Sequence, residues 1–148
     1  NYRNWVTEER LRGIYPRLGQ DFTPGQCMQC GNTPCERVCP TRATGVGPGG
    51  IITVEAKKCI GCKYCMTACP YNARYYNEET GAVDKCTFCV HRIAQGRPPA
   101  CVETCPTKVR TFGDLNDPDS AVSRLLLQNP HRVLKPEMGT KPFLFYLI

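Results

Sequence analysis

Three blocks of cysteine constrain this chain more than any other feature of its sequence. Twelve of its 148 residues are cysteine, and each block begins with Cys-x-x-Cys and ends with Cys-Pro. In order, the blocks contain Cys27, Cys30, Cys35 and Cys39, then Cys59, Cys62, Cys65 and Cys69, then Cys86, Cys89, Cys101 and Cys105. A chain of this length buries only a modest apolar core, and cysteine at this density indicates that cross-links or metals organise the fold. What the thiols bind therefore decides the fold class.

The second block has the spacing C-x2-C-x2-C-x3-C-P, which is the run by which bacterial ferredoxins hold 4Fe-4S clusters. Three cysteines on a tight loop bind three irons of one cubane, while the fourth, turned away by the proline, binds a neighbouring cluster. The first and third blocks differ from it only in having four and eleven residues ahead of their third cysteine. The pattern predicts that all twelve cysteines are 4Fe-4S ligands and that the chain transfers electrons.

Zinc and disulfide bonds are the two other uses that such cysteines could have. A tetrahedral zinc site typically takes two separated Cys-x-x-Cys pairs, whereas residues 59 to 69 hold four thiols and end in Cys-Pro. Disulfides within Cys-x-x-Cys pairs would be strained and local, and would not join distant parts of the chain. Both alternatives fit the repeated blocks less well than clusters do.

Sharing of the fourth cysteine pairs the first two blocks. If each block gives its last cysteine to the other block's cluster, two clusters, A and B, close on each other. The predicted ligands of cluster A are Cys27, Cys30, Cys35 and Cys69, and those of cluster B are Cys59, Cys62, Cys65 and Cys39.

The third block has no partner block in this sequence. Cys86, Cys89 and Cys101 would hold a cluster C whose fourth ligand is missing, and Cys105 would bind a cluster shared with another block. Either the third block closes on itself, with Cys105 on cluster C, or a further cysteine block precedes Asn1. The absence of an initiator Met favours the second alternative, which predicts two to three clusters in this chain and four in a full-length protein.

Charge and hydropathy argue against two classes of protein. The formal net charge is +6 with every cysteine counted as neutral, yet each oxidised cubane with its four thiolates contributes about −2. Lys and Arg are scattered along the sequence, which does not predict a nucleic-acid surface. The longest apolar stretch, at 143 to 148, has six residues and cannot cross a bilayer, so any membrane attachment would come through a partner.

Three regions follow from the punctuation of the chain. Residues 1 to 26 are expected to form short strands or turns that lead into the cluster-binding body, at 27 to 113. Residues 114 to 148 are expected to form a helix and a tail that either packs against the domain or docks on another subunit. The predicted fold is α+β, with ferredoxin-like cluster-binding repeats.

Regular elements are expected to be short. A strand is predicted at 51 to 54, and a hairpin near 75 to 83 with its turn at 77 to 81. A helix is predicted over 121 to 128, because Asp117-Pro118 and Ser120 provide a start and Asn129-Pro130 an end.

No catalytic constellation is evident outside the cysteines. Backbone N–H groups near Gly31 and Gly61 are candidate donors to cluster sulfurs, although both glycines could serve the turn alone. His91 and His131 are expected at surface or packing positions. Tyrosines near the blocks are expected to exclude water from the clusters; they are Tyr64, Tyr71, Tyr75 and Tyr76.

Six stretches of sequence carry a family resemblance that covers nearly the whole chain. They lie at 27 to 35, 58 to 65, 68 to 75, 85 to 92, 99 to 106 and 135 to 140. Together they resemble the iron–sulfur subunits of the dimethyl sulfoxide reductase superfamily, above all those of polysulfide, thiosulfate and tetrathionate reductases and of the nitrite reductase complex. That family has four blocks and four clusters, with the middle blocks paired and the first paired with the last. This chain departs from the pattern because it lacks the first block.

The resemblance implies an oxidoreductase subunit that is not catalytic by itself. Its partners would be a molybdopterin-containing catalytic subunit acting on a sulfur compound and an integral membrane subunit that reacts with quinone. Electrons would pass between them along the clusters, on the periplasmic face of the cytoplasmic membrane or else on its cytoplasmic face. The alternative is a free, polyferredoxin-like soluble carrier, but such a carrier would need neither the N-terminal segment nor the cysteine-free tail.

Overall fold

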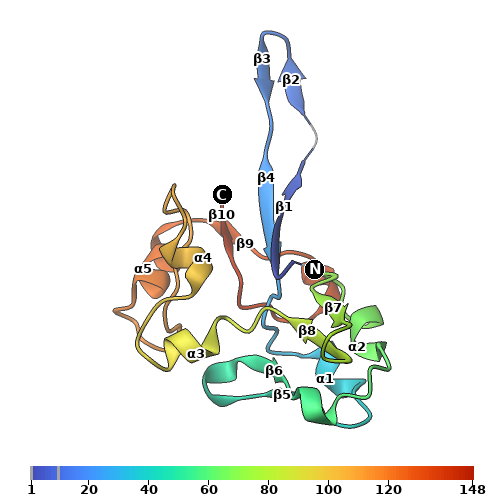
Figure 1. The fold of residues 1–148 in the computed structure, drawn as a ribbon. Coiled ribbons are helices and arrows are strands. Elements are labelled where there is room, and N and C mark those ends of the chain that lie inside the picture. The colour runs from blue at the N-terminus through green and yellow to red at the C-terminus, as the bar shows by residue number, and fades with distance from the viewer. Residues whose placement is uncertain (1, 10) are drawn as a thin grey trace. The chain divides into compact units, whose positions relative to one another are not determined.

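Short strands and short helices alternate along the chain in the computed structural model, which describes residues 2–9 and 11–148 (Figure 1). The strands are β1 (Asn4–Glu8), β2 (Arg12–Ile14), β3 (Arg17–Gly19), β4 (Phe22–Gln26), β5 (Thr44–Val46), β6 (Ile52–Val54), β7 (Arg74–Asn77), β8 (Ala82–Lys85), β9 (His131–Arg132) and β10 (Tyr146–Leu147). The α-helices are α1 (Pro34–Arg37), α2 (Tyr64–Thr67), α3 (Val90–Ile93), α4 (Ala100–Glu103) and α5 (Ala121–Gln128), and the 3-10 helices are η1 (Pro48–Gly50), η2 (Ala56–Lys58) and η3 (Pro136–Met138). The predicted α+β class is confirmed.

The chain forms two compact units. The strands of the described residues form two-stranded sheets. The first unit comprises 1–28, 33–45 and 53–86, and the second comprises 29–32, 46–52 and 87–148. The cysteine loops contribute to both units.

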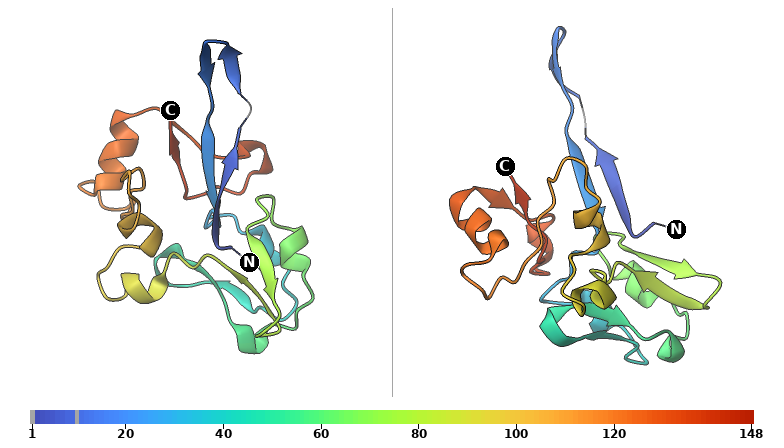
Figure 2. Two further views of the ribbon diagram at one scale, coloured as in Figure 1. Left: turned by 45° about the horizontal axis from the view of Figure 1, so that its top comes forward. Right: turned by 60° about the vertical axis from the view of Figure 1, so that its left-hand side comes forward.

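A long antiparallel hairpin opens the first unit. Strand β1 pairs with β4 from Asn4 opposite Gln26 to Glu8 opposite Phe22, and β2 pairs with β3 beyond them. The hairpin stays extended in all views (Figure 2). A Cβ atom at position 25 would lie 2.4 Å from the Trp5 ring, so glycine there lets the indole pack on the backbone. The predicted strands before the first cysteine are confirmed.

Cysteines contribute to the core of the first unit. Strands β7 and β8 form the predicted hairpin, and α1 and α2 lie against each other. Buried Cys35, Cys65 and Val83 form a cluster against which Cys59, Met66 and Tyr76 pack. Since cysteines occupy most of this cluster, the fold around it depends on what the thiols hold.

The second unit contains α5 and the C-terminal tail. Ser120 caps α5 as predicted, because its hydroxyl accepts a hydrogen bond from the Ser123 N–H at 3.1 Å. The tail crosses the loop at 29–32, where the N–H groups of Gly31 and Asn32 donate to the carbonyls of Lys141 and Thr140 at 2.8 and 3.0 Å. The tail therefore packs against the first cysteine loop within its own unit.

Candidate iron–sulfur cluster sites

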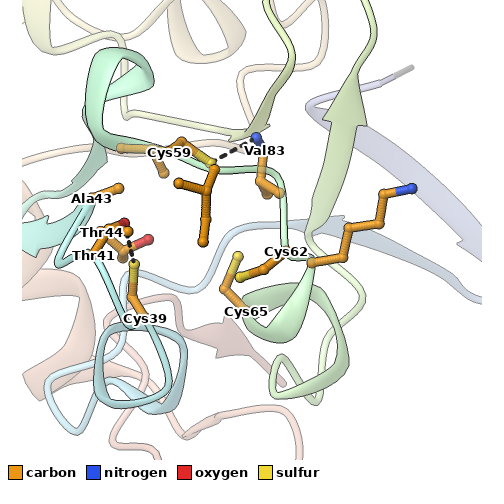
Figure 3. Close-up of a pocket in the computed structure, with 11 residues that line it drawn as sticks. Cys39, Thr41, Ala43, Thr44, Cys59, Cys62, Cys65 and Val83 are labelled. Atoms are coloured by element: carbon orange, nitrogen blue, oxygen red, sulfur yellow. Dashed lines mark hydrogen bonds between the residues drawn. The ribbon is translucent and has the colours of Figure 1, made fainter.

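Four cysteines from two different blocks line one pocket in the first unit (Figure 3). They are Cys39, Cys59, Cys62 and Cys65, the four predicted ligands of cluster B. The rest of the lining comprises Thr41, Ala43, Thr44, Val54, Ile60, Lys63 and Val83. The hollow holds about 310 Å³ of space, part of it open to solvent, and Cys62 is the exposed member of the four. The structure thus brings together the thiols of one block and the last thiol of another.

Each block builds its third and fourth cysteines in the same way. The third cysteine is the second residue of a four-residue helix: Cys35 in α1, Cys65 in α2 and Cys101 in α4. The fourth cysteine follows two residues after that helix, so that Cys-Pro ends each repeat. In the first block this spacing places Cys39 in the pocket described above, whose lining does not include Cys35.

The loop between Cys59 and Cys65 needs glycine at its turn. Gly61 has φ +67°, and a Cβ there would lie 3.1 Å from the Tyr76 ring and 3.2 Å from the Gly81 carbonyl oxygen. Other residues are strained in this conformation and would also collide with the hairpin. Glycine at position 61 therefore permits the close packing of this loop on β7 and β8.

The N–H of Gly31 itself is bonded within its own unit. It donates to the Lys141 carbonyl, and a Cβ there would lie 3.1 Å from the Phe143 ring. Donation to a cluster sulfur by other N–H groups near this turn stays a prediction. In the pocket that holds the predicted ligands of cluster B, the Val83 N–H donates to the Cys59 Sγ at 3.4 Å.

A cradle of hydrogen-bond donors surrounds Cys39. Burial opposes its charged form, but backbone N–H groups of Thr44, Ala43 and Thr41 and the Thr41 hydroxyl outweigh burial and hold the pKa of Cys39 below its ordinary value. The Thr41 hydroxyl lies 3.8 Å from the Cys39 Sγ. These donors stabilise the thiolate, which is the form that binds iron.

The same cradle is repeated at Cys105. The Thr107 hydroxyl, 3.5 Å from the Cys105 Sγ, and the N–H groups of Val109, Thr107 and Arg110 lower the pKa of Cys105. The donors stand two, four and five residues after the cysteine, as at Cys39. The third residue after each Cys-Pro cysteine has a left-handed φ, and these residues are Arg42, Asn72 and Lys108.

Three of the four predicted ligands of cluster A lie near one another in the first unit. Burial raises the pKa of Cys35, and the neighbouring charges of Cys27 and Cys69 raise it further. Cys30, the remaining predicted ligand, is also buried but belongs to the second unit. The first unit alone therefore assembles Cys27, Cys35 and Cys69.

The third block is divided between the units. Cys86 ends the first unit, whereas Cys89, Cys101 and Cys105 belong to the second. Within the second unit, Arg92 of α3 donates to the Pro98 carbonyl at 2.9 Å and forms an ion pair with Glu103 of α4. These contacts hold together the two helices that follow Cys89 and carry Cys101.

The thiol sets fit iron–sulfur clusters. None of the twelve cysteines forms a disulfide bond in the structure, and soft thiolate ligands favour such clusters. Over residues 2–9 and 11–148, no three Cys, His, Asp or Glu side chains lie close enough to hold one metal ion. A cubane does not require that, because each of its ligands binds a different iron.

Two buried cations near these thiols were not anticipated from the sequence. Arg74 is 6% exposed, and its Nη2 donates to the Cys35 Sγ at 2.9 Å. Lys85 is 0% exposed, and its Nζ donates to the Cys86 carbonyl at 2.8 Å. No local sequence pattern around either residue indicates burial. The donors to Cys39 and Cys105 could have been anticipated, because a threonine stands two residues after each cysteine.

Aromatic and histidine positions agree with most of the expectations. Tyr71 is buried and Tyr76 packs on the cysteine core, but Tyr64 is 64% exposed, so its predicted role in excluding water is wrong. His91 and His131 are exposed, as predicted for surface positions. In the part of the chain that the structure describes, no helix has the length and apolar character to cross a membrane.

Comparisons with known proteins give a consistent result. The family of 4Fe-4S dicluster domains matches residues 18–115, a range that includes all twelve cysteines. The chain is 51% identical over 126 residues to the B subunit of the tetrathionate reductase of Salmonella typhimurium, covering 84% of this chain and 50% of that protein. It is 51% identical over 129 residues to the B chain of the polysulfide reductase of Wolinella succinogenes, covering 86% and 68%.

A third relative extends the match to another named reductase. The protein of Halobacterium salinarum that is named as a putative dimethyl sulfoxide reductase iron–sulfur subunit is 41% identical over 158 residues, covering 91% of this chain and 60% of that protein. The chain thus spans about half to two thirds of the length of the curated relatives that it matches.

Proposed function

Because the chain belongs to the 4Fe-4S dicluster family and is homologous to the iron–sulfur subunits of tetrathionate and polysulfide reductases, we propose that it is the electron-transfer subunit of a multisubunit oxidoreductase. The observation that carries the proposal is the pocket that Cys39 shares with Cys59, Cys62 and Cys65. A site built from two sequence blocks is what the ligand sharing of a cluster pair requires.

The proposed ligand sets follow the sharing rule. Cluster B takes the four pocket cysteines, and cluster A takes Cys27, Cys30, Cys35 and Cys69. Support for cluster A comes from the charges of Cys27 and Cys69 that act on Cys35. On this proposal the first two blocks bind a self-sufficient pair of clusters.

The third block is proposed to hold half of a second pair. Cys86, Cys89 and Cys101 supply three ligands of cluster C, and Cys105 is a ligand presented to a cluster whose other cysteines lie on a different block. The cradle around Cys105 supports this, because it repeats the donors around Cys39, a thiol that reaches the pocket of another block. Closure of the third block on itself, with Cys105 on cluster C, is the competing assignment.

The protein's contribution to electron transfer is to bind, shield and tune. A cubane changes its charge by one on reduction without making or breaking bonds to a substrate, so it supplies the redox chemistry. Apolar side chains of the pocket, including Val54 and Val83, restrict water. The N–H of Val83 and the hydroxyl of Thr41 face ligand sulfurs and favour added negative charge there.

Partners and location are proposed from the relatives. Two of these are named as parts of reductases for tetrathionate and polysulfide, so we propose a sulfur compound as the substrate of a molybdopterin-containing catalytic partner. A quinone-reactive membrane subunit would exchange electrons at the other end of the cluster row. The complex would face the periplasm, with the cytoplasmic face as the alternative.

Purification of the natural complex tests this proposal. We expect the chain to copurify with a molybdenum-containing subunit and a membrane subunit, and to contain iron and acid-labile sulfide. Recovery as a lone soluble iron–sulfur protein would support the free-carrier alternative. A chain without labile sulfide would overturn cluster binding itself.

A further inference from the structure

We propose that Arg74 is a buried cation shared by the ligand sets of clusters A and B, and that it raises the reduction potentials of both. This inference rests on the proposed cluster binding. It goes beyond it by assigning a tuning residue that is not a ligand.

The position of Arg74 in the fold makes its charge unusually effective. It is the first residue of β7 and is 6% exposed, so water screens its guanidinium poorly. Nη2 donates to the Cys35 Sγ at 2.9 Å, and Nη1 donates to the Thr44 Oγ1 at 3.1 Å. The two hydrogen bonds fix the planar group in place, and Arg keeps its charge at any physiological pH.

The guanidinium acts on thiols assigned to both clusters. Cys35 is a proposed ligand of cluster A, and Cys65 is a proposed ligand of cluster B. Cys35, which accepts the hydrogen bond of Arg74, packs in the same buried cluster as Cys65, so the cation lies close to a proposed ligand of each cluster. One cation therefore lies near the third cysteines of the first two blocks, which are carried by α1 and α2.

The hairpin of β7 and β8 buries two cationic side chains, which would lower its stability without negative charge nearby. Arg74 stands directly opposite Lys85 in the register of β7 and β8, and both side chains are buried. Like charges in opposite positions destabilise a strand pair, and burial of two cations adds to that cost. Anionic clusters beside them would offset this cost, so the pair is better explained by the clusters than by the stability of the hairpin.

The direction of the effect follows from charge. An oxidised cubane with four thiolates carries about −2, and reduction adds one negative charge. A fixed cation stabilises the more negative state more strongly, which favours reduction. Removal of the cation should therefore lower both potentials, and more so at cluster A, whose ligand accepts the direct hydrogen bond.

Redox titration followed by EPR tests the proposal in the iron-loaded full chain. In Arg74→Gln we expect both one-electron couples to become harder to reduce, by at least tenfold in equilibrium constant at cluster A, or about 59 mV. Arg74→Lys keeps the charge and should stay closer to the natural protein. Arg37→Gln is the matched control, because Arg37 lies two residues from Cys35 on α1 but is exposed.

Three outcomes would overturn the proposal. They are unchanged potentials in Arg74→Gln, a fall confined to one cluster, and an equal fall in Arg74→Lys, which would indicate packing. If Arg74→Gln fails to assemble its clusters, the natural protein with nitrogen-15 arginine gives the answer. Pulsed EPR of the reduced clusters should detect a guanidinium nitrogen coupled to both, and its absence would overturn the assignment.

These results separate the inference from the proposed function. The function proposal is lost if the natural chain is recovered as a lone soluble protein or lacks iron and labile sulfide. Loss of the inference requires a natural chain with both clusters and potentials that do not respond to Arg74.

Discussion

The pocket of the first two blocks and the third block use the same local design with different support. In both regions the third cysteine lies on a four-residue helix and the fourth follows in Cys-Pro. Cys35 and Cys65 are both 7% exposed and belong to a core with Val83, whereas α3 and α4 contain no buried residue. The ion pair of Arg92 with Glu103 lies near the surface of its unit.

This difference separates structure that one block can form by itself from structure that needs two blocks. A Cys-Pro repeat can build a thiol cradle by local hydrogen bonds alone, as at Cys105. A closed site needs a second block that brings its own helix, core residues and buried cation. We propose that the first two blocks provide these for each other, whereas the third block, with no buried residue on α3 or α4, depends more on local contacts.

Loss of Cys39 should produce the largest contrast between the regions. Cys39→Ala removes the only pocket ligand that comes from the first block, so we expect the loss of cluster B, about four irons per chain. Cys105→Ala should leave clusters A and B intact. Iron and labile-sulfide analysis measures both, and equal loss in the two variants would remove the distinction between the regions.

Glycine substitutions compare the backbone of the two regions. Gly61→Ala forces a left-handed residue against Tyr76 and Gly81, and we expect a loss of roughly 2 kcal/mol or more in unfolding free energy. Gly96→Ala has a similar φ of +71° but no atom within 4 Å, and should cost about 1 kcal/mol. Denaturant unfolding of the cluster-loaded protein distinguishes them. Similar losses would mean that the second-block loop is not packed as described.

The cap of α5 tests whether the second unit affects the clusters of the first two blocks. Ser120→Ala removes the hydroxyl that accepts from the Ser123 N–H, at a cost of about 1 kcal/mol. Unfolding should shift by that amount while the optical and EPR spectra of clusters A and B remain unchanged. Altered spectra would show that the helix supports the cluster pair.

The smallest expected effect concerns the thiol cradle. Thr41→Val removes a hydroxyl from the Cys39 Sγ, so the potential of cluster B should fall by less than a tenfold change in equilibrium constant. Thr67→Val, on an exposed part of α2, serves as the control and should not change it. A fall as large as that expected for Arg74→Gln would give the cradle a role equal to that of the buried cation and contradict the expected order of effects.

Local patterns predicted local structure well. The helix from Ala121 to Gln128, its Ser120 cap and the hairpin of β7 and β8 were anticipated because their signals lie within a few residues. The family was anticipated too, because cysteine spacing is specific, and the match over residues 18–115 confirms it.

Contacts between distant segments were not predictable from such patterns. Burial of Arg74 depends on distant thiols, as its hydrogen bond to Cys35, 39 positions away, illustrates. Likewise, the tail takes the Gly31 N–H from more than a hundred residues away. Tyr64, the first residue of α2, is exposed, which the sequence alone does not specify. Each of these needs the tertiary fold.

The central claim is that the first two blocks bind a complete pair of clusters without the third. It is tested most directly by replacing Cys86, Cys89, Cys101 and Cys105 together with alanine and measuring iron, labile sulfide and the EPR spectrum of the reduced protein. Two clusters should remain, about eight irons and eight sulfides per chain, with the magnetic interaction of a close pair. Retention of one cluster or none would contradict the claim.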